Sequence, residues 1–239
     1  MAIAAPANAG SEDAAFDWTG TYVGIFAGSG RADNRIVDIE GFANWGNPGW
    51  TVDYGESEFV GGALIGRKLD IGSLPLRIEF DGTFGRLPAS SNKLDPEGLD
   101  ETVDSEFRWI VTARGGMDHS IGPATVFAVG GLAVARIDNS VTDIDFGPGM
   151  PTRVDPDDSF RDSSTEIGWT VGLGIEAPLT DTWTLRLEGS YLDFGGRTHY
   201  VNRLGDARCG PDKPRRPCPY EIENELGIVR LAVIRRFGP

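Results

Sequence analysis

Two adjacent segments of strict alternation, residues 166–178 and 183–194, constrain the fold more than any other feature of the chain. Their apolar face carries Trp169, Val171, Leu173, Ile175, Trp183, Leu185, Leu187 and Tyr191. The opposite face carries glycine, threonine and charged residues. A period of two predicts β-strands, and residues 179–182 between the segments predict a tight hairpin turn. The hairpin alone allows either a lipid-facing apolar surface around a polar lumen or an apolar core in a soluble domain.

Similar segments recur along the whole chain and predict eight strands. We expect them at about residues 18–30, 59–69, 76–86, 107–117, 124–135, 166–178, 183–194 and 226–237. The connections after the second, fourth and sixth strands are short. Those near 31–57, 87–105, 138–164 and 196–223 are long, polar and rich in Gly, Pro and acid. Repeated glycines inside the strands favour a tightly curved, closed sheet.

The asymmetry of the connections decides between the two arrangements of the hairpin. Short turns at one end and long loops at the other are typical of an outer-membrane barrel, whose strands need only about 9–11 residues each. A soluble lipocalin-type barrel is the alternative, with its apolar face inside. Aromatic residues near the strand ends fit the interfacial girdles of a membrane barrel better: Trp18, Phe84, Trp109, Trp183, Tyr191 and Phe237.

The chain resembles the small eight-stranded outer-membrane barrels, meaning the OmpA transmembrane domain and related surface-antigen and porin-family proteins of alphaproteobacteria. The matching segments are 18–24, 109–114, 130–133, 168–176, 183–188, 191–195 and 229–237. The resemblance implies an all-β, antiparallel, up-and-down barrel with short periplasmic turns and long extracellular loops, in the outer membrane of a Gram-negative bacterium. Two departures are Gly238-Pro239 after the terminal aromatic residue and Arg235 where the family usually has an aromatic.

The resemblance also implies a salt-bridge cluster that blocks or gates the lumen. Its expected members are Glu79, Arg114, Glu176 and Arg186, with Arg77, Asp81 and Glu188 nearby. The lumen of an eight-stranded barrel is narrow enough for side chains to fill, so buried charges there must be paired. A purely structural polar core without gating is the alternative interpretation.

Several features outside the strands complete the expectations. Residues 1–15 are interpreted as a residual signal-peptide tail with a flexible start, since Ala7-Asn8-Ala9 fits a cleavage site, and residues 16–239 as the barrel. Two cysteines, Cys209 and Cys218, suggest one disulfide.

Asp155, Asp157 and Asp158 are a candidate Ca²⁺ group that lacks the spacing of a defined motif. Lys213, Arg215 and Arg216 form a basic island that would contact lipopolysaccharide phosphates or acidic loops, or serve as unspecific surface charge.

A net charge of −14 argues against nucleic-acid binding. His119 and His199 lie in no recognisable nucleophile motif, so we expect no enzyme and no cofactor. The expected partners are outer-membrane lipid, lipopolysaccharide and the barrel-assembly machinery. The predicted function is a barrel with a plugged lumen that contributes to envelope integrity and surface display; a small-solute pore and a loop-mediated adhesin are the alternatives.

Overall fold

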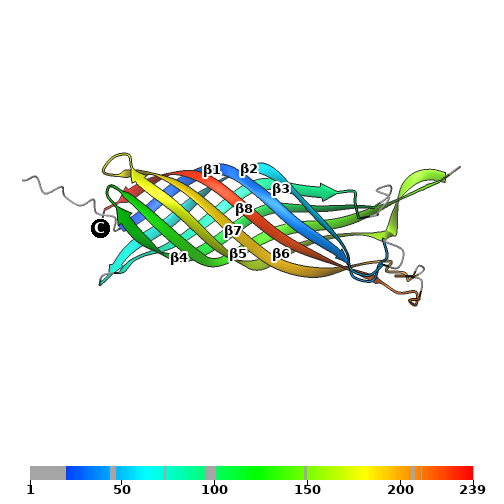
Figure 1. The fold of residues 1–239 in the computed structure, drawn as a ribbon. Helices are drawn as coiled ribbons and strands as arrows, with labels where there is room; N and C mark the ends of the chain where they lie inside the picture. The colour runs from blue at the N-terminus through cyan, green and yellow to red at the C-terminus, as the bar shows by residue number, and fades with distance from the viewer. Residues whose placement is uncertain are drawn as a thin grey trace, which may run out of the picture.

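The protein forms a closed barrel of eight antiparallel strands, each paired with its neighbours in the sequence and β1 with β8 (Figure 1). The computed structural model describes residues 20–43, 47–72, 74–94, 101–147, 150–205, 208–210 and 212–238, without the side chains of 146, 147, 150 and 151. The expected signal-peptide tail and Trp18 lie outside these residues. The strands are β1 (Gly20–Asp38), β2 (Trp50–Ile71), β3 (Leu74–Ser91), β4 (Glu101–Ile121), β5 (Ala124–Gly147), β6 (Met150–Pro178), β7 (Trp183–Val201) and β8 (Cys218–Phe237).

Short turns join β2 to β3, β4 to β5 and β6 to β7 at one end of the barrel, which we call the lower end. Gly72 and Gly122 take φ values of 68° and 59° there, a left-handed conformation that glycine adopts without steric cost. The C-terminus lies at the same end in Figure 1. No helix among the described residues is long and apolar enough to cross a membrane.

In the lower part of the barrel the apolar side chains face outward. Leu173 on β6 is 69% exposed and Ile25 on β1 is 70% exposed, whereas Glu176 and Tyr22 are buried inside. Other exposed members of this belt include Phe80, Val111, Leu132, Leu187, Val229 and Leu231. The apolar face of the hairpin formed by residues 166–178 and 183–194 therefore lies on the outside, as the asymmetry of the connections predicted.

The strands continue far into the segments that we expected to be loops, so the predicted upper boundaries were wrong. The connections at the upper end are only residues 39–49, 92–100, 148–149 and 202–217. The reason is that the apolar residues move from the outer face of the strand to the inner face. On β1, Ala32, Asn34 and Ile36 are buried while Arg31, Asp33 and Arg35 face solvent, so the polar residues that suggested a loop occupy the outer face of a strand.

Above the belt of exposed apolar side chains the barrel changes into a two-sheet sandwich. The ladder between β2 and β3 extends up only to Gly61 and Phe84, and that between β6 and β7 only to Trp169 and Asp193. The other six pairings continue toward the upper end, which leaves one sheet of β7, β8, β1 and β2 and another of β3 to β6. Both sheets contribute to a buried apolar core that includes Ile36, Tyr54, Leu87, Phe107, Ile137, Phe160, Leu192, Phe194, Ile222 and Leu226.

A β-bulge on β4 corrects one detail of the predicted facing. The register between β4 and β5 shifts between Phe107 and Trp109, so Arg108 is the extra residue. Unbroken alternation through the expected strand at 107–117 would place Arg108 on the inner face, together with Arg114. The bulge instead turns Arg108 outward, where its Nε donates to Asp138 at 2.7 Å.

Arg235 faces outward near the lower rim of β8. Its guanidinium lies 5.8 Å from the ring centroid of Trp183 and 5.4 Å from that of Phe237. A cation over an aromatic face is attracted by the ring quadrupole, and a long arginine side chain reaches an interface from an apolar wall. The two aromatic rings thus stabilise the positive charge of Arg235, the residue that departs from the family pattern.

Candidate functional site

Ten charged side chains meet inside the lower part of the barrel, and we call them the lumen cluster. Five are cations and five are anions, so the cluster has no net charge: Lys68, Arg77, Arg114, Arg186 and Arg230 face Glu79, Asp81, Asp118, Glu176 and Glu188. Their side chains are at most 6% exposed. Seven of the ten were expected from the sequence; Lys68, Asp118 and Arg230 were not.

Arg186 occupies the centre of the cluster and is fully buried. Its Nη1 donates to Glu79 at 2.5 Å, and its Nε donates to Glu176 at 2.8 Å. Tyr22 adds a neutral donor, since its hydroxyl lies 2.8 Å from Glu79. Arg114 also pairs with Glu79. Glu79 is therefore held from three directions by groups on β1, β4 and β7.

The layer below contains Lys68, Arg77, Asp118 and Glu176. Arg77 forms a two-pronged pair with Asp118, at 2.5 Å from Nε and 2.8 Å from Nη2, and its Nη1 reaches Glu176 at 3.1 Å. Lys68 pairs with both carboxylates. The expected strand bounds, 107–117 and 124–135, place Asp118 and His119 in the turn between those strands. The structure extends β4 to Ile121, so Asp118 points into the lumen and His119 is an exposed strand residue.

The layer above is built around Asp81, Glu188 and Arg230. Arg230 donates to Asp81 at 3.0 Å and to Glu188 at 2.9 Å. Arg114 connects this layer to Glu79, because its Nη1 also donates to Glu188 at 2.5 Å. The sequence contained a signal for Arg230, which alternates with the outward Val229 and Leu231. Three acid–base pairs lie directly opposite each other on neighbouring strands: Glu79 with Arg114, Glu176 with Arg186, and Glu188 with Arg230.

Aromatic rings line the same space. The guanidinium of Arg77 lies 3.8 Å from the ring centroid of Phe127, and that of Arg230 lies 4.3 Å from the centroid of Phe26. These rings fill volume that charged groups leave and interact favourably with the cations. The cluster is thus a packed, charge-neutral layer across the lumen, an arrangement suited to closing it.

A polar network crosses the sandwich core above the lumen cluster. Asn224 donates to Asn34 at 3.1 Å, Asn139 donates to Asn224 at 3.0 Å, and Ser105 donates to Asn139 at 2.6 Å. The hydroxyl of Tyr54 lies 2.7 Å from that of Ser105. Because these residues come from both sheets, the network fixes one sheet against the other within an otherwise apolar core.

The seam between β6 and β7 is bridged by side chains above the last ladder pair. Arg197 on β7 pairs with Glu166 at 2.7 Å and with Asp162 at 3.3 Å. His199 stacks on Phe160 with ring centroids 4.7 Å apart, and its Nδ1 lies 3.6 Å from Asp162. Burial lowers the pKa of His199 below its usual value. This histidine holds a seam together through packing.

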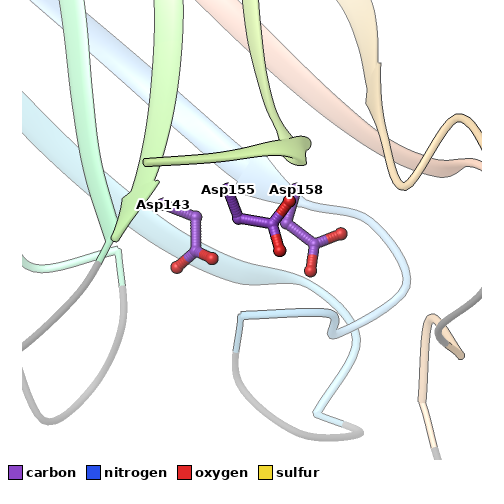
Figure 2. Close-up of side chains that lie close together, drawn as sticks. All are labelled: Asp143, Asp155 and Asp158. Atoms are coloured by element: carbon purple, nitrogen blue, oxygen red, sulfur yellow. The ribbon is translucent and has the colours of Figure 1, made fainter. Parts of the chain in front are cut away.

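Three carboxylates gather at the top of the β5–β6 hairpin (Figure 2). One oxygen from each of Asp143, Asp155 and Asp158 lies within 4.8 Å of the others. Asp157, the third member of the expected Ca²⁺ group, has a different role: its Oδ1 accepts from the backbone N–H of Leu204 at 2.8 Å. The structure therefore groups Asp143 with Asp155 and Asp158, because the hairpin brings β5 against β6 at this point.

Cys209 and Cys218 form a disulfide with a Cα–Cα distance of 5.4 Å. It closes most of the connection between β7 and β8. Of the expected basic island, Arg216 forms an ion pair with Glu40 of the β1–β2 connection. Lys213 and Arg215 are exposed.

Comparison with known proteins identifies the family. The model of the outer membrane protein beta-barrel domain matches residues 1–206. The chain belongs to this family. The lower end with the short turns is accordingly the periplasmic end, the upper end is extracellular, and the protein is located in the outer membrane of a Gram-negative bacterium.

Named relatives and a solved barrel agree with this assignment. The 31 kDa outer-membrane immunogenic protein of Brucella melitensis is 28% identical over 190 residues, which covers 76% of this chain and 73% of that protein. The 25 kDa outer-membrane immunogenic protein of Brucella abortus is 25% identical over 184 residues, covering 77% and 69%. Neither name is enzymatic. The crystal structure of OprG from Pseudomonas aeruginosa has a TM-score of 0.55 at 10% identity, covers 92% of this chain and 98% of that one, and shows the same fold.

Proposed function

We propose that the protein is a non-enzymatic structural barrel of the outer membrane, closed to solutes, that contributes to envelope integrity and displays a β-sandwich at the cell surface. The observation that carries the proposal is the lumen cluster. Its five cations and five anions are packed in three layers across the barrel. A buried ion network of this kind is costly to break, since each removed partner leaves an unpaired charge.

The extracellular sandwich adds a second barrier above the cluster. Val60, Leu87, Phe107 and Ile137 are each at most 1% exposed in the core that both sheets share. A solute that enters from the extracellular side therefore meets a packed apolar interior before it reaches the lumen cluster. This favours a closed barrel over the small-solute pore, the alternative that the sequence left open.

Planar-bilayer recordings test the closed lumen. We expect the purified wild-type protein to insert without producing steady channels. The matched variant Glu176→Ala with Arg186→Ala removes one carboxylate and one guanidinium, keeps the lumen cluster neutral, and should conduct more often than wild type. Steady, sizeable conductance from the wild-type protein would refute the closed lumen and revive the pore.

The proposed partners follow from the surfaces of the barrel. The apolar belt would contact membrane lipid and lipopolysaccharide, and the barrel-assembly machinery would act on the chain during insertion. Slower gel migration after boiling, in protein extracted from outer membranes with detergent, is the expected sign of correct assembly. Protein that stays soluble without detergent and migrates identically before and after boiling would contradict this part of the proposal.

A further inference from the structure

The connection between β7 and β8, residues 202–217, is the β7–β8 loop at the extracellular tip (Figure 1, orange). Its sequence has five Lys and Arg against two Asp, in a chain whose net charge is −14. All five are exposed: Arg203, Arg208, Lys213, Arg215 and Arg216, of which Arg216 pairs with Glu40. A strongly acidic protein thus carries a local excess of positive charge at its extracellular end.

The base of the loop is held firmly while its cations face solvent. Cys209 and Cys218 are both fully buried and joined by the disulfide. Asn202 donates from its backbone to the carbonyl of Asp157 at 2.6 Å and from its side chain to the carbonyl of Arg216 at 2.8 Å. A loop fixed in this way loses little conformational entropy when its side chains bind a ligand.

Two arginines lie directly opposite each other beside the disulfide: Arg208 just before Cys209, and Arg215 within the segment that the disulfide closes. Arg208 and Arg215 form an isolated antiparallel β-bridge, which places their side chains on neighbouring strands. Guanidinium groups that lie side by side offer two sets of donors, so one anion can accept charge-assisted hydrogen bonds from both.

We propose that the β7–β8 loop binds a polyanionic glycan through its phosphate or sulfate groups. The acidic wall beside the loop selects this class of ligand. Glu221, Glu223 and Glu225 alternate along β8 on its outer face, and they would repel a stiff, evenly charged polymer such as a nucleic acid. A flexible glycan with spaced anionic groups contacts the loop without lying along that wall. The glycan belongs either to the lipopolysaccharide of the same cell or to a surface that the cell meets.

Biolayer interferometry on the full-length protein in lipid nanodiscs tests the proposal. The probes are heparin and a phosphorylated lipopolysaccharide core oligosaccharide, each compared with its desulfated or dephosphorylated form. The loop variant replaces four of the exposed cations by Gln and keeps Arg216, which pairs with Glu40: Arg203→Gln, Arg208→Gln, Lys213→Gln and Arg215→Gln. The control replaces four arginines of the barrel wall that pair with carboxylates: Arg31→Gln, Arg35→Gln, Arg86→Gln and Arg108→Gln.

We expect wild type to bind at least one charged probe, and the loop variant to bind it at least about tenfold more weakly while the control stays within about twofold. Binding should weaken with added salt, because exposed charges are screened. Binding of the core oligosaccharide alone would assign the ligand to the cell's own lipopolysaccharide, and binding of heparin would assign it to a sulfated glycan from outside. Equal loss in both variants, or no binding of either probe by wild type, would refute the proposal. Neither result bears on bilayer conductance, so the closed lumen is tested separately.

Discussion

Replacing Arg186 by Met should cost much more stability than replacing an exposed arginine. The substitution keeps most of the side-chain volume and removes one positive charge from the lumen cluster. Glu79 and Glu176 lose their contacts at 2.5 and 2.8 Å. The cluster changes from five cations and five anions to a net charge of −1, at a position where Arg186 is fully buried.

The magnitude follows from burial. Removing one partner of a buried ion pair costs about 3–5 kcal/mol, because the remaining charge is uncompensated. The matched exposed variant is Arg35→Met, whose side chain is 52% exposed and pairs with Asp53 at 2.7 Å. An exposed pair of this kind contributes about 0–1 kcal/mol.

Urea unfolding from phospholipid vesicles, followed by tryptophan fluorescence, measures both costs. A double variant, Arg186→Met with Glu176→Gln, restores neutrality with four cations and four anions and should recover part of the loss. Coupling between two residues in contact is typically about 0.5–3 kcal/mol. If Arg186→Met costs no more than Arg35→Met, or if the double variant is less stable than the sum of the single effects, charge balance does not govern this lumen.

Three further predictions concern other parts of the molecule. Phe107→Ala should cost about 3–5 kcal/mol in the same assay, since Phe107 is fully buried against Phe194 in the sandwich core; a cost under about 1 kcal/mol would argue against that core. Burial lowers the pKa of His199, so the folded state disfavours its charged form. Because an unfolded histidine takes up a proton near pH 6.5, stability should fall as the pH drops through that value. His199→Phe should reduce this slope in unfolding titrations at pH 7.5 and 5.5; an unchanged slope would argue against the burial of this imidazole. Arg235→Leu should stabilise by no more than about 1 kcal/mol, as expected near an interface; a larger gain would place Arg235 within the hydrocarbon layer.

Strand periodicity predicted the membrane-embedded part of the fold because lipid imposes a simple rule on it. Every outward side chain there must be apolar, and every second residue faces outward. The outward position of Trp169, Val171, Leu173 and Ile175 could therefore be predicted without knowing which strands pair with this one. The same rule placed Glu79, Arg114, Glu176 and Arg186 inside, and the structure brings these four into one cluster.

The extracellular half was not predictable by the same rule, because solvent replaces lipid and the apolar face turns inward. On β1 the change occurs between Ile25, exposed to lipid, and Ile36, buried in the sandwich. When the apolar residues change from one face to the other within a strand, the sequence looks as though the strand ends at that point. The bulge at Arg108 has the same effect, since one extra residue exchanges the two faces.

The sequence by itself determined the number of strands, the lipid-facing surface and the inward position of most lumen charges, because each depends only on alternation along one segment. The tertiary structure decided which charges meet, how far the strands extend and where the barrel divides into two sheets. Lys68, Asp118 and Arg230 joined the cluster only when the registers of neighbouring strands were fixed. Asp143 joined Asp155 and Asp158 in the same way, across a hairpin. Contacts between segments depend on register and curvature, and these are properties of the closed sheet as a whole.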